Sequence, residues 1–494
     1  MGIPEFDETH KILFASAEVV PFAKTGGLAD VAGSLPKALA TYGNDVRIVM
    51  PRYSRIEAKR TIADFPVQVG SRKATAIVRE GDIEARMDGT IRKVPVYFID
   101  NYHYFDRDHI YGYWDEAERF AFLSRAVLEM IKVLGFRPDV IHCNDWQTGP
   151  IPLLLKEQYQ QDPFYRGIAT VFTIHNLRYQ GNFPKESLNL LGLGDEYFQP
   201  GKLEFYGSMS FMKAGLVWSD VLNTVSRTYA NEIQHPEYGE RFEGILQQRS
   251  HDLYGICNGI NIHEYNPATD PRITHNFTVD ELEGKRRNKL ELQREMGLPQ
   301  LDVPLLGLVS RLVDQKGLDL IEGIAEELMQ RQLQLVILGT GDGHYEDMFR
   351  DLRNKYPDKI GVEIGFNVTL AQRIYAGCDM FLMPSAFEPC GLGQLISLRY
   401  GTIPIVRATG GLQDTVIDYD PNTGSGNGFS FTNYEPHALL EAIERALYLF
   451  ENQRAWHSLI QKAMKEDHSW NRSAAEYMGL YKNALAHHLA VLTA

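Results

Sequence analysis

Two basic, glycine-containing turns nearly three hundred residues apart are the segments of this chain best suited to binding an anion. The first is KTGGLADV at residues 24–31, and the second is SRLVDQKG at residues 310–317. Each follows an apolar run and precedes a helical pattern, and a helix N-terminus offers free N–H groups and partial positive charge to a phosphate. Two such turns in separate halves predict a nucleotide-linked enzyme whose ligand is held in a cleft between two domains.

The charged residues of these turns have specific uses. Arg311 and Lys316 lie five positions apart, a spacing at which arginine and lysine can clamp a diphosphate, although two solvated surface cations would look the same. Lys24 precedes a glycine pair, Gly26 and Gly27, which lets a ligand approach the backbone. Asp30 falls in the first turn of the following helix, where it faces a ligand or only complements the helix dipole.

Polar residues also follow predicted strands of the first half, at HCNDW (142–146) and TIHNL (173–177). Ligands of parallel sheets bind beyond the carboxyl ends of strands, so Asp145, His175 and Asn176 are candidates. A lone histidine is more often a structural residue held by hydrogen bonds. Two such sites in one domain favour a functional role.

In the second half, PSAFEPCGLG (384–393) follows a predicted strand and places Glu388 before a proline and a glycine-flanked helix start. Such a carboxylate would accept hydrogen bonds from sugar hydroxyls. The TGGL turn (409–412) offers another helix N-terminus to a phosphate. The turn containing Gly339 and Thr340 resembles a dinucleotide fingerprint, but its third glycine comes too early.

Metal sites are not expected. The D-x-D patterns at 106–108 and 418–420 do not directly end convincing core strands, so solvated loop carboxylates explain them better. A calcium loop starting at Asp418 would have Thr423 in place of its glycine and Phe429 in place of its bidentate glutamate. The sequence therefore predicts no metal and no cofactor.

Short apolar runs alternate with helical patterns such as that of residues 318–328, which indicates buried parallel sheets covered by helices on both faces. The predicted strands are 12–17, 46–50, 94–99, 139–142, 169–174 and 221–225, then 305–309, 333–338, 362–364, 380–383, 403–406 and 428–431. Turn signals at 255–269 indicate the hinge. We expect an α/β protein with two doubly wound, Rossmann-like domains, residues 1–262 and 263–473, with 474–494 returning to the first.

The bulk properties narrow the function class. A chain of 494 residues is long enough for two domains, and a net charge of −14 argues against nonspecific nucleic-acid binding. No apolar stretch is long enough for a membrane span, and the start resembles neither a signal nor a transit peptide. The four scattered cysteines suggest reduced thiols. A cytoplasmic location is expected, with a plastid as the alternative if a transit peptide was removed.

Taken in order, these motifs closely resemble those of the bacterial glycogen synthase and plant starch synthase family, retaining glucosyltransferases of the GT-B fold. The matching segments span nearly the whole chain and are residues 24–31, 142–146, 173–177 with 180–181, 258–260, 310–317, 388–392 and 409–412. The resemblance implies glucose transfer from ADP-glucose to the non-reducing 4-OH of an α-1,4-glucan. It implies a hinged clamp that closes on both substrates, and no metal.

The resemblance also implies residue roles. Lys24 would contact the donor diphosphate, Arg311 and Lys316 would stabilise the leaving nucleotide, His175 would lie at the anomeric carbon, and Glu388 would hold the glucose hydroxyls. These five are the expected catalytic residues. The expected substrate-binding residues are Lys24, Gly26, Gly27, Asp30, Asp145, Asn176, Asn258, Arg311, Lys316, Gly339, Thr340, Phe366 (beside the adenine), Glu388, Cys390, Gly391, Leu392, Thr409, Gly410 and Gly411.

One position departs from the wider GT-B pattern. Many retaining members have a second glutamate eight residues after the first, in contact with ribose, and here that position is Ile396. The ribose contact must therefore come from elsewhere. No residue is an obvious covalent nucleophile, and the hypothesis for retention is a front-side displacement in which the donor phosphate assists the acceptor.

Other functions stay open at this level. The donor could be UDP-glucose, as in a sucrose-synthase-like enzyme, because the base contacts cannot be recognised in the sequence. A glucan phosphorylase is disfavoured because no lysine lies in a recognisable pyridoxal phosphate motif. A non-catalytic glucan-binding protein is the alternative from another class. The oligomeric state, and the choice between glycogen and starch, are not predicted.

Overall fold

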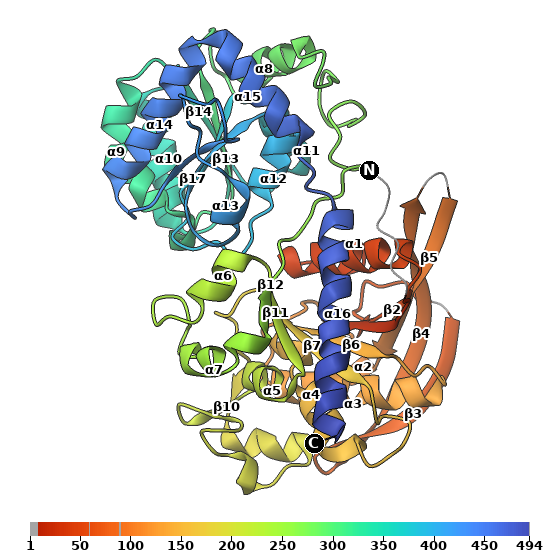
Figure 1. Ribbon diagram of the computed structural model, residues 1–494. Coiled ribbons are helices and arrows are strands. Elements are labelled where there is room, and N and C mark those ends of the chain that lie inside the picture. The colour runs from red at the N-terminus through yellow and green to blue at the C-terminus, as the bar shows by residue number, and fades with distance from the viewer. Residues whose placement is uncertain (1–7, 59, 88–89, 494) are drawn as a thin grey trace. The chain divides into compact units, whose positions relative to one another are not determined.

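The computed structural model describes residues 8–58, 60–87 and 90–493, which divide into two compact units (Figure 1). The first unit comprises the chain up to Val225, Ala230–Ile256 and the stretch from Trp470 onward; the second comprises Ser226–Tyr229 and Cys257–Ser469. The chain thus changes units six residues before the expected position, because pairing with the first sheet ends at Gly255. It returns at Trp470, four residues before the expected position, where the last helix begins.

The first unit, within the described ranges, contains a nine-stranded sheet in the order β12-β11-β7-β6-β1-β2-β5-β4-β3. Neighbours from β12 to β5 run parallel. These strands are β1 (Lys11–Ala15), β2 (Asp45–Pro51), β5 (Thr90–Asp100), β6 (Val140–Asn144), β7 (Ala169–Ile174), β11 (Val221–Thr224) and β12 (Leu253–Gly255). The chain runs outward from β1 in one direction and then resumes beside β1 with β6. The order therefore reverses between β1 and β6, and such a switch point is where ligands bind to doubly wound sheets.

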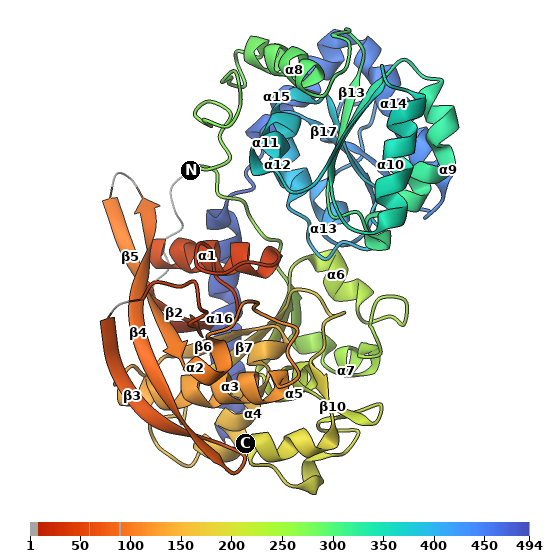
Figure 2. The same cartoon turned by 180° about the vertical axis from the view of Figure 1, so that it is seen from behind.

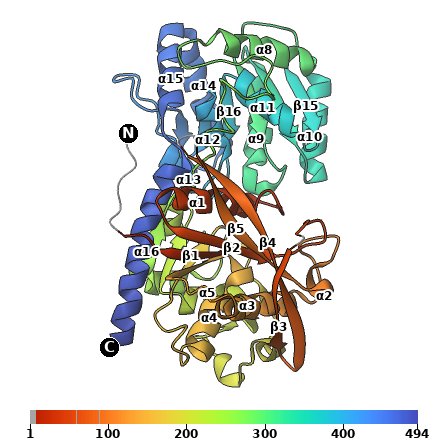
Figure 3. The ribbon, with the colours of Figure 1, turned by 90° about the vertical axis from the view of Figure 1, so that its right-hand side faces the viewer.

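A long antiparallel hairpin extends this sheet and was not among the predicted strands. It consists of β3 (Arg60–Val69) and β4 (Arg72–Met87), and β4 pairs antiparallel with β5 (Figure 3). Phe65, Val67 and Val69 are buried and alternate with exposed residues, the period-2 pattern of a strand with one covered face. A separate small sheet pairs β8 (Asn182–Phe183), β10 (Ser208–Ser210) and β9 (Glu204–Phe205).

The last helix, α16 (Trp470–Thr493), packs within the first unit against α1 (Gly27–Thr41) and strands β6, β7 and β11 (Figure 1). Tyr481 Oη lies 2.8 Å from His142 Nδ1, and Asn223 Nδ2 donates to Tyr477 Oη at 3.0 Å. The other helical segments of this unit are α2 (Tyr102–Phe105), α3 (Glu116–Val133), η1 (Trp146–Thr148), α4 (Pro150–Leu154), η2 (Leu155–Tyr159), η3 (Lys185–Leu191), η4 (Asp195–Tyr197), α5 (Phe211–Trp218), α7 (Glu243–Gln248) and η5 (Ser250–Asp252), while α6 (Arg227–Glu232) spans the change of unit.

The second unit contains a parallel sheet in the order β15-β14-β13-β16-β17-β18. Its strands are β13 (Leu305–Val309), β14 (Gln334–Gly339), β15 (Ile360–Ile364), β16 (Met380–Met383), β17 (Ile403–Arg407) and β18 (Phe429–Phe431). The order again reverses beside the first strand, between β13 and β16, as in a Rossmann fold. Loops after β13 and β16 are therefore the expected ligand-binding loops of this unit.

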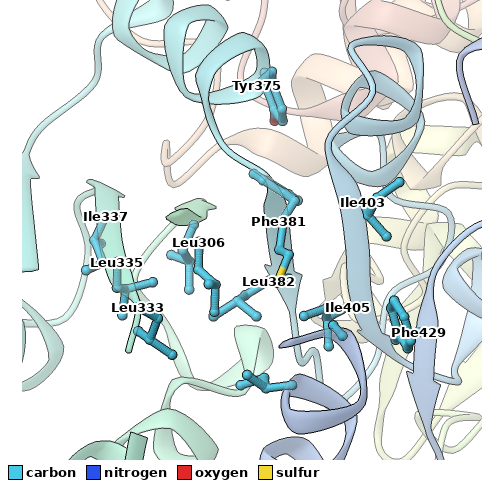
Figure 4. Packing of buried hydrophobic residues seen from close by; sticks show 14 of the residues in the cluster. Leu306, Leu333, Leu335, Ile337, Tyr375, Phe381, Leu382, Ile403, Ile405 and Phe429 are labelled. Carbon is cyan, nitrogen blue, oxygen red and sulfur yellow. The ribbon is translucent and has the colours of Figure 1, made fainter. Parts of the chain in front are cut away.

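Helices cover both faces of the second sheet, with α9, α10 and α14 on one face and α8, α11 and α12 on the other (Figure 2). Their bounds, with those of η6, α13 and α15, are α8 (Glu283–Glu295), η6 (Asp314–Lys316), α9 (Leu318–Met329), α10 (Gly343–Lys355), α11 (Val368–Gly377), α12 (Gly393–Arg399), α13 (Gly410–Thr415), α14 (Pro436–Glu451) and α15 (Gln453–Lys465). Leu306, Leu335, Leu382 and Ile405 of adjacent strands lie on the same face of the sheet and contribute to the core (Figure 4). None of the described helices combines the length and apolarity needed to cross a membrane.

Candidate active-site residues

An ion pair occupies the switch point of the second unit. Lys316 Nζ, from the turn after β13, lies 2.7 Å from Glu388 Oε2, from the loop after β16. Ser385 Oγ donates to the same carboxylate oxygen at 3.0 Å, and both charged side chains are mostly buried. Two residues selected from separate motifs are thus brought together, with a carboxylate and an ammonium at one point.

Close backbone packing fixes this pair. Gly317 has φ +69°, and a methyl group there would lie 1.9 Å from the Pro384 carbonyl oxygen, so only glycine fits. Ala386 N donates to Gln315 O at 2.9 Å, which joins the two loops directly. Backbone contacts between the two loops therefore fix the position of Lys316 relative to Glu388.

The glycine pair after β17 packs against the Glu388 loop from the other side. A methyl group at Gly410 (φ +47°) would lie 1.8 Å from Glu388 O, and one at Gly411 would lie 2.0 Å from Cys390 O. The Gly411 N–H donates to the Glu388 and Pro389 carbonyls at 3.1 Å each. The segment of buried Thr409, Gly410 and Gly411 thus supports the loop, and the Gly411 N–H that a phosphate could have used is already bonded.

Gln394 is a supporting residue that the sequence analysis missed. Its buried amide donates to Cys390 O at 2.9 Å and Gly391 O at 3.0 Å. Burial raises the pKa of the Cys390 thiol well above its usual value, so this cysteine is an uncharged packing residue. Leu392 packs partly buried against the apolar core and completes the loop.

Arg311 and Phe366 are available to a ligand. The Arg311 side chain is exposed and makes no hydrogen bond or ion pair with any residue of the described ranges. Phe366 follows β15 and is 89% exposed. A basic group and a bare aromatic ring at the carboxyl ends of β13 and β15 suit a phosphate and a base, respectively.

The remaining candidates of this unit differ in whether the protein already occupies their polar groups. A methyl group at Gly339 would lie 2.1 Å from Ser310 O, so this glycine brings the turn after β14 against the Arg311 turn. The Thr340 hydroxyl already donates to Glu346 Oε1 at 2.7 Å. Asn258 is half-buried, and its side-chain oxygen has no partner within the described ranges. Ile396 is buried in the apolar core, where it offers nothing to a ribose.

At the switch point of the first unit, Asp145 and His175 follow β6 and β7. Asp145 has φ +57°, which is uncommon for a residue with a side chain, and its Oδ1 accepts the His175 N–H at 2.8 Å. Burial raises the pKa of Asp145 to about 7; backbone hydrogen bonds from His175 and Asn176 oppose this, and the charge of Glu18 adds to it. Asp145 is thus a half-buried carboxyl group that changes charge near neutrality.

His175 is neutral at pH 7, because burial lowers its pKa to about 3. Its Nε2 lies 2.8 Å from Asn144 Oδ1, and Asn144 Nδ2 donates to Ala15 O at 3.0 Å. The asparagine oxygen therefore faces the ring, so Nε2 carries the proton and Nδ1 keeps a lone pair. Neighbouring Asn176 is half-buried and accepts the Arg178 N–H at 3.1 Å.

The turn before α1 differs from the expected phosphate cradle. Lys24, 52% exposed at its side chain, pairs with Asp30 Oδ1 at 2.7 Å. Gly26 and Gly27 have open space where a side chain would be, as expected for a surface that a ligand approaches. The N–H groups of Thr25 and Gly26, however, donate to the buried carboxylate of Glu18, which sequence reasoning did not select.

The carboxylates of the D-x-D pattern at 418–420 have protein partners. Asp418 forms hydrogen bonds with Arg445 at 2.9 and 3.0 Å, and Asp420 accepts the Asn422 N–H and the Thr423 hydroxyl. Among the described residues, no three or more His, Cys, Asp or Glu side chains are grouped as metal ligands would be. These loop carboxylates therefore act as local supports.

Comparison with known proteins places these features in a family. Residues 11–248 match the family model of the starch synthase catalytic domain, and residues 291–465 match that of glycosyl transferases group 1. A glycogen synthase of Desulforudis audaxviator is 64% identical, over 97% of each chain. A glycogen synthase of Moorella thermoacetica is 54% identical, over 96% of this chain and 97% of its own.

Solved structures agree with these matches. The catalytic domain of starch synthase IV from Arabidopsis thaliana, bound to ADP and acarbose, superposes with a TM-score of 0.86 at 33% identity, over 97% of this chain and all of its own. A sucrose-phosphate synthase from Thermosynechococcus elongatus, at 18% identity and a TM-score of 0.58, shares the fold alone. The predicted pair of Rossmann-like domains is confirmed, and the chain belongs to the glycogen synthase and starch synthase family of GT-B glycosyltransferases.

Proposed function

We propose that this enzyme transfers glucose from ADP-glucose to the 4-OH at the non-reducing end of an α-1,4-glucan, with retention of configuration. The bond between the anomeric carbon and the donor phosphate breaks, and a bond to the acceptor oxygen forms on the same face. ADP leaves with the electron pair, and the departing phosphate takes the proton of the acceptor hydroxyl. The observation that carries this proposal is 64% identity with a glycogen synthase over nearly the whole of both chains.

The second unit is proposed to bind the donor. Arg311 and Lys316 would hold the diphosphate and stabilise its developing charge; the exposed Arg311 side chain has no partner among the residues that the structure describes. Glu388 would accept hydrogen bonds from glucose hydroxyls, and Phe366 would stack on the adenine. The starch synthase IV catalytic domain, described as bound to ADP and acarbose, supports a nucleotide and a glucan as ligands of the shared fold.

The first unit is proposed to supply the residues on the acceptor side. A neutral His175 suits a position near the anomeric carbon, because a cation there would oppose the oxocarbenium-like transition state. Lys24 would contact the diphosphate or position the acceptor, and Asp145 and Asn176 would line the sugar side. Asn258, at the start of the second unit, would contribute a side-chain oxygen to a sugar hydroxyl.

Charge stabilisation by Arg311 and Lys316 is proposed to replace a metal, so no cofactor is required. Donor preference follows the family, with UDP-glucose as the alternative. The bacterial relatives favour a cytoplasmic location, with a plastid as the alternative. We propose no nucleic-acid partner, in keeping with the net charge of −14, and no membrane partner.

The test is nucleotide release from ADP-glucose and, separately, from UDP-glucose, with and without glycogen, in EDTA. We expect glycogen-dependent release of ADP that EDTA does not reduce. A preference for UDP-glucose would overturn the donor, and activity lost in EDTA and restored by a divalent ion would overturn metal independence. No release from either donor would favour a non-catalytic glucan-binding protein.

A further inference from the structure

Glu18 is a buried carboxylate at the switch point of the first sheet, and the proposed chemistry gives it no role. It lies three residues beyond the end of β1 and is 4% exposed. Ser16 Oγ donates to the Glu18 carbonyl at 2.7 Å and accepts its N–H at 3.3 Å, so the backbone at this point is fixed. A carboxylate this well buried needs several hydrogen-bond donors. The segments that supply these donors are the segments that Glu18 holds in place.

Three of those donors belong to the Lys24 turn. Glu18 Oε2 accepts the Thr25 N–H at 2.5 Å and the Gly26 N–H at 3.3 Å, and Oε1 accepts the Thr25 hydroxyl at 2.6 Å. These N–H groups come immediately before helix α1, where an anion is favoured. An anion of the protein itself therefore occupies part of the site in which the sequence predicted a phosphate.

The fourth donor comes from another loop. Tyr111 Oη donates to Glu18 Oε1 at 2.7 Å. Its loop is rigidly held, because the buried Arg119 donates to Ile110 O at 2.9 Å and Arg107 pairs with Asp115 through two 2.6 Å bonds. Each oxygen of Glu18 thus accepts two hydrogen bonds, from an anchored loop on one side and the Lys24 turn on the other.

The position of the Lys24 ammonium group depends on the hydrogen bonds between Glu18 and the Lys24 turn. Its Nζ pairs with Asp30 on the first turn of α1, whereas its backbone leads directly into the two residues that Glu18 holds. Asp30 alone, with an exposed lysine, makes a surface ion pair of little fixed geometry. Glu18, rather than Asp30, therefore fixes the turn that carries Lys24.

We propose that Glu18 is a positioning residue for glucosyl transfer, which holds the turn of residues 24–27 so that Lys24 is presented to the reacting sugar nucleotide. This proposal rests on the proposed function. Among the described residues, four donors bind the carboxylate: two N–H groups at Oε2 and two hydroxyls at Oε1. Glu18→Gln could still donate to the two hydroxyls, which also accept, but it would remove the negative charge that strengthens all four hydrogen bonds. Glu18 also contributes to the raised pKa of Asp145, which places these two carboxyl groups near one another.

The test is a double-mutant cycle of Glu18→Gln and Lys24→Ala, read as kcat and KM for ADP release. We expect Glu18→Gln to lower kcat by about 10- to 100-fold, the value of a charge-assisted hydrogen bond or two. We expect the double variant to match Lys24→Ala within about twofold, because both changes remove the same contribution. Tyr111→Phe, which removes one donor and no charge, should lower kcat by about threefold.

A matched control separates positioning from stability. Asp270 is also a buried carboxylate that accepts a backbone N–H, from Arg272 at 2.9 Å, and a tyrosine hydroxyl, from Tyr400 at 2.5 Å, but it belongs to no segment assigned to the site. Asp270→Asn should lower Tm at least as much as Glu18→Gln and leave kcat near wild type. Multiplicative effects of Glu18→Gln and Lys24→Ala, or wild-type kcat in Glu18→Gln, would overturn the proposal.

Hydrogen exchange gives a readout independent of activity. The Thr25 and Gly26 amides should exchange faster in Glu18→Ala than in the wild type, with no change at residues 140–144 of buried β6. Unchanged exchange at Thr25 and Gly26 would contradict the proposal. If the wild type released no nucleotide from either sugar donor, the proposed function would fail, and the exchange result would still decide whether Glu18 holds the turn.

Discussion

Lys316 Nζ lies 2.7 Å from Glu388 Oε2, and the two residues come from loops after different strands at the point where the second sheet reverses its order. The ammonium that would bind a diphosphate is thus balanced by the carboxylate that would bind the sugar. Neither charge is left unpaired when the donor is absent, which matters because both side chains are mostly buried. Donor binding would supply new partners to each.

Glu388→Ala should lower kcat for ADP release by about 100-fold or more, because the variant loses the hydrogen bonds to the hydroxyls of the donor glucose. Glycogen binding should be retained. Tm should also fall, since Lys316 keeps a buried charge with no partner. The measurements are ADP release, affinity electrophoresis in glycogen gels and thermal unfolding. Glu444→Ala, which breaks a surface pair with Arg331, is the control and should preserve activity. Near wild-type turnover in Glu388→Ala would show that the site is misassigned.

Arg311→Ala should raise KM for ADP-glucose by about tenfold or more, because an ionised donor to phosphate is lost. The unfolding free energy should change by less than about 0.5 kcal/mol, because the exposed side chain has no partner within the described ranges. Initial rates at varied donor concentration and chemical denaturation measure both. Arg353→Ala, in the last turn of α10, is the matched control for loss of an exposed arginine. An unchanged KM in Arg311→Ala would exclude the diphosphate role.

Phe366→Ala should raise KM for ADP-glucose and the inhibition constant of ADP by about 3- to 10-fold, the value of one aromatic stacking contact. KM for glycogen and Tm should stay unchanged, because the ring is 89% exposed and packs on little. Tyr448→Ala removes another ring, 80% exposed on α14, and should leave all these constants near wild type. A change in KM for glycogen but not for ADP-glucose would place Phe366 on the acceptor side instead.

Asp145 should make stability fall as pH rises toward neutrality. Its pKa is about 7 in the folded protein and near the usual value of 3.8 when unfolded. Between pH 4 and 7 the folded state therefore holds a proton that the unfolded state has lost, and the contribution to stability declines through that window. Removing the titrating group in Asp145→Asn should raise stability relative to wild type from pH 4 to 7, by up to a few kcal/mol. Denaturation at several pH values tests this; a stability difference independent of pH would contradict the raised pKa.

The sequence predicted the parallel strands other than β12, because strands buried on both faces appear as short continuous apolar runs. The three residues of β12 are only partly buried, and they were missed. The β3–β4 hairpin escaped notice because only its alternating positions are buried, so Phe65, Val67 and Val69 are separated by polar residues or Pro66. A period-2 reading would have found it. Strands of two or three residues, such as β8 and β9, have too little pattern of their own and depend on tertiary contacts.

Prediction of the site was limited in the same way, because some of its contacts depend on the tertiary fold. Sequence reasoning selected Lys316 and Glu388 separately, but their pairing depends on Gly317 packing against the Pro384 carbonyl, which no local pattern encodes. It also expected free N–H groups before α1, whereas Glu18 already accepts two of them from across a loop. A glutamate just after a buried apolar strand was the available signal, because burying a charge is costly unless it has several partners.

The measurement that tests the central claim most directly is proton NMR of the enzyme with ADP-glucose and maltoheptaose, which follows the anomeric signals together with ADP. The account predicts that each ADP released is matched by one new α-1,4-linked glucose at the non-reducing end, with no free glucose. Appearance of a β-linked residue would contradict retention. Free glucose in step with ADP, without elongation of the acceptor, would contradict a glucan synthase.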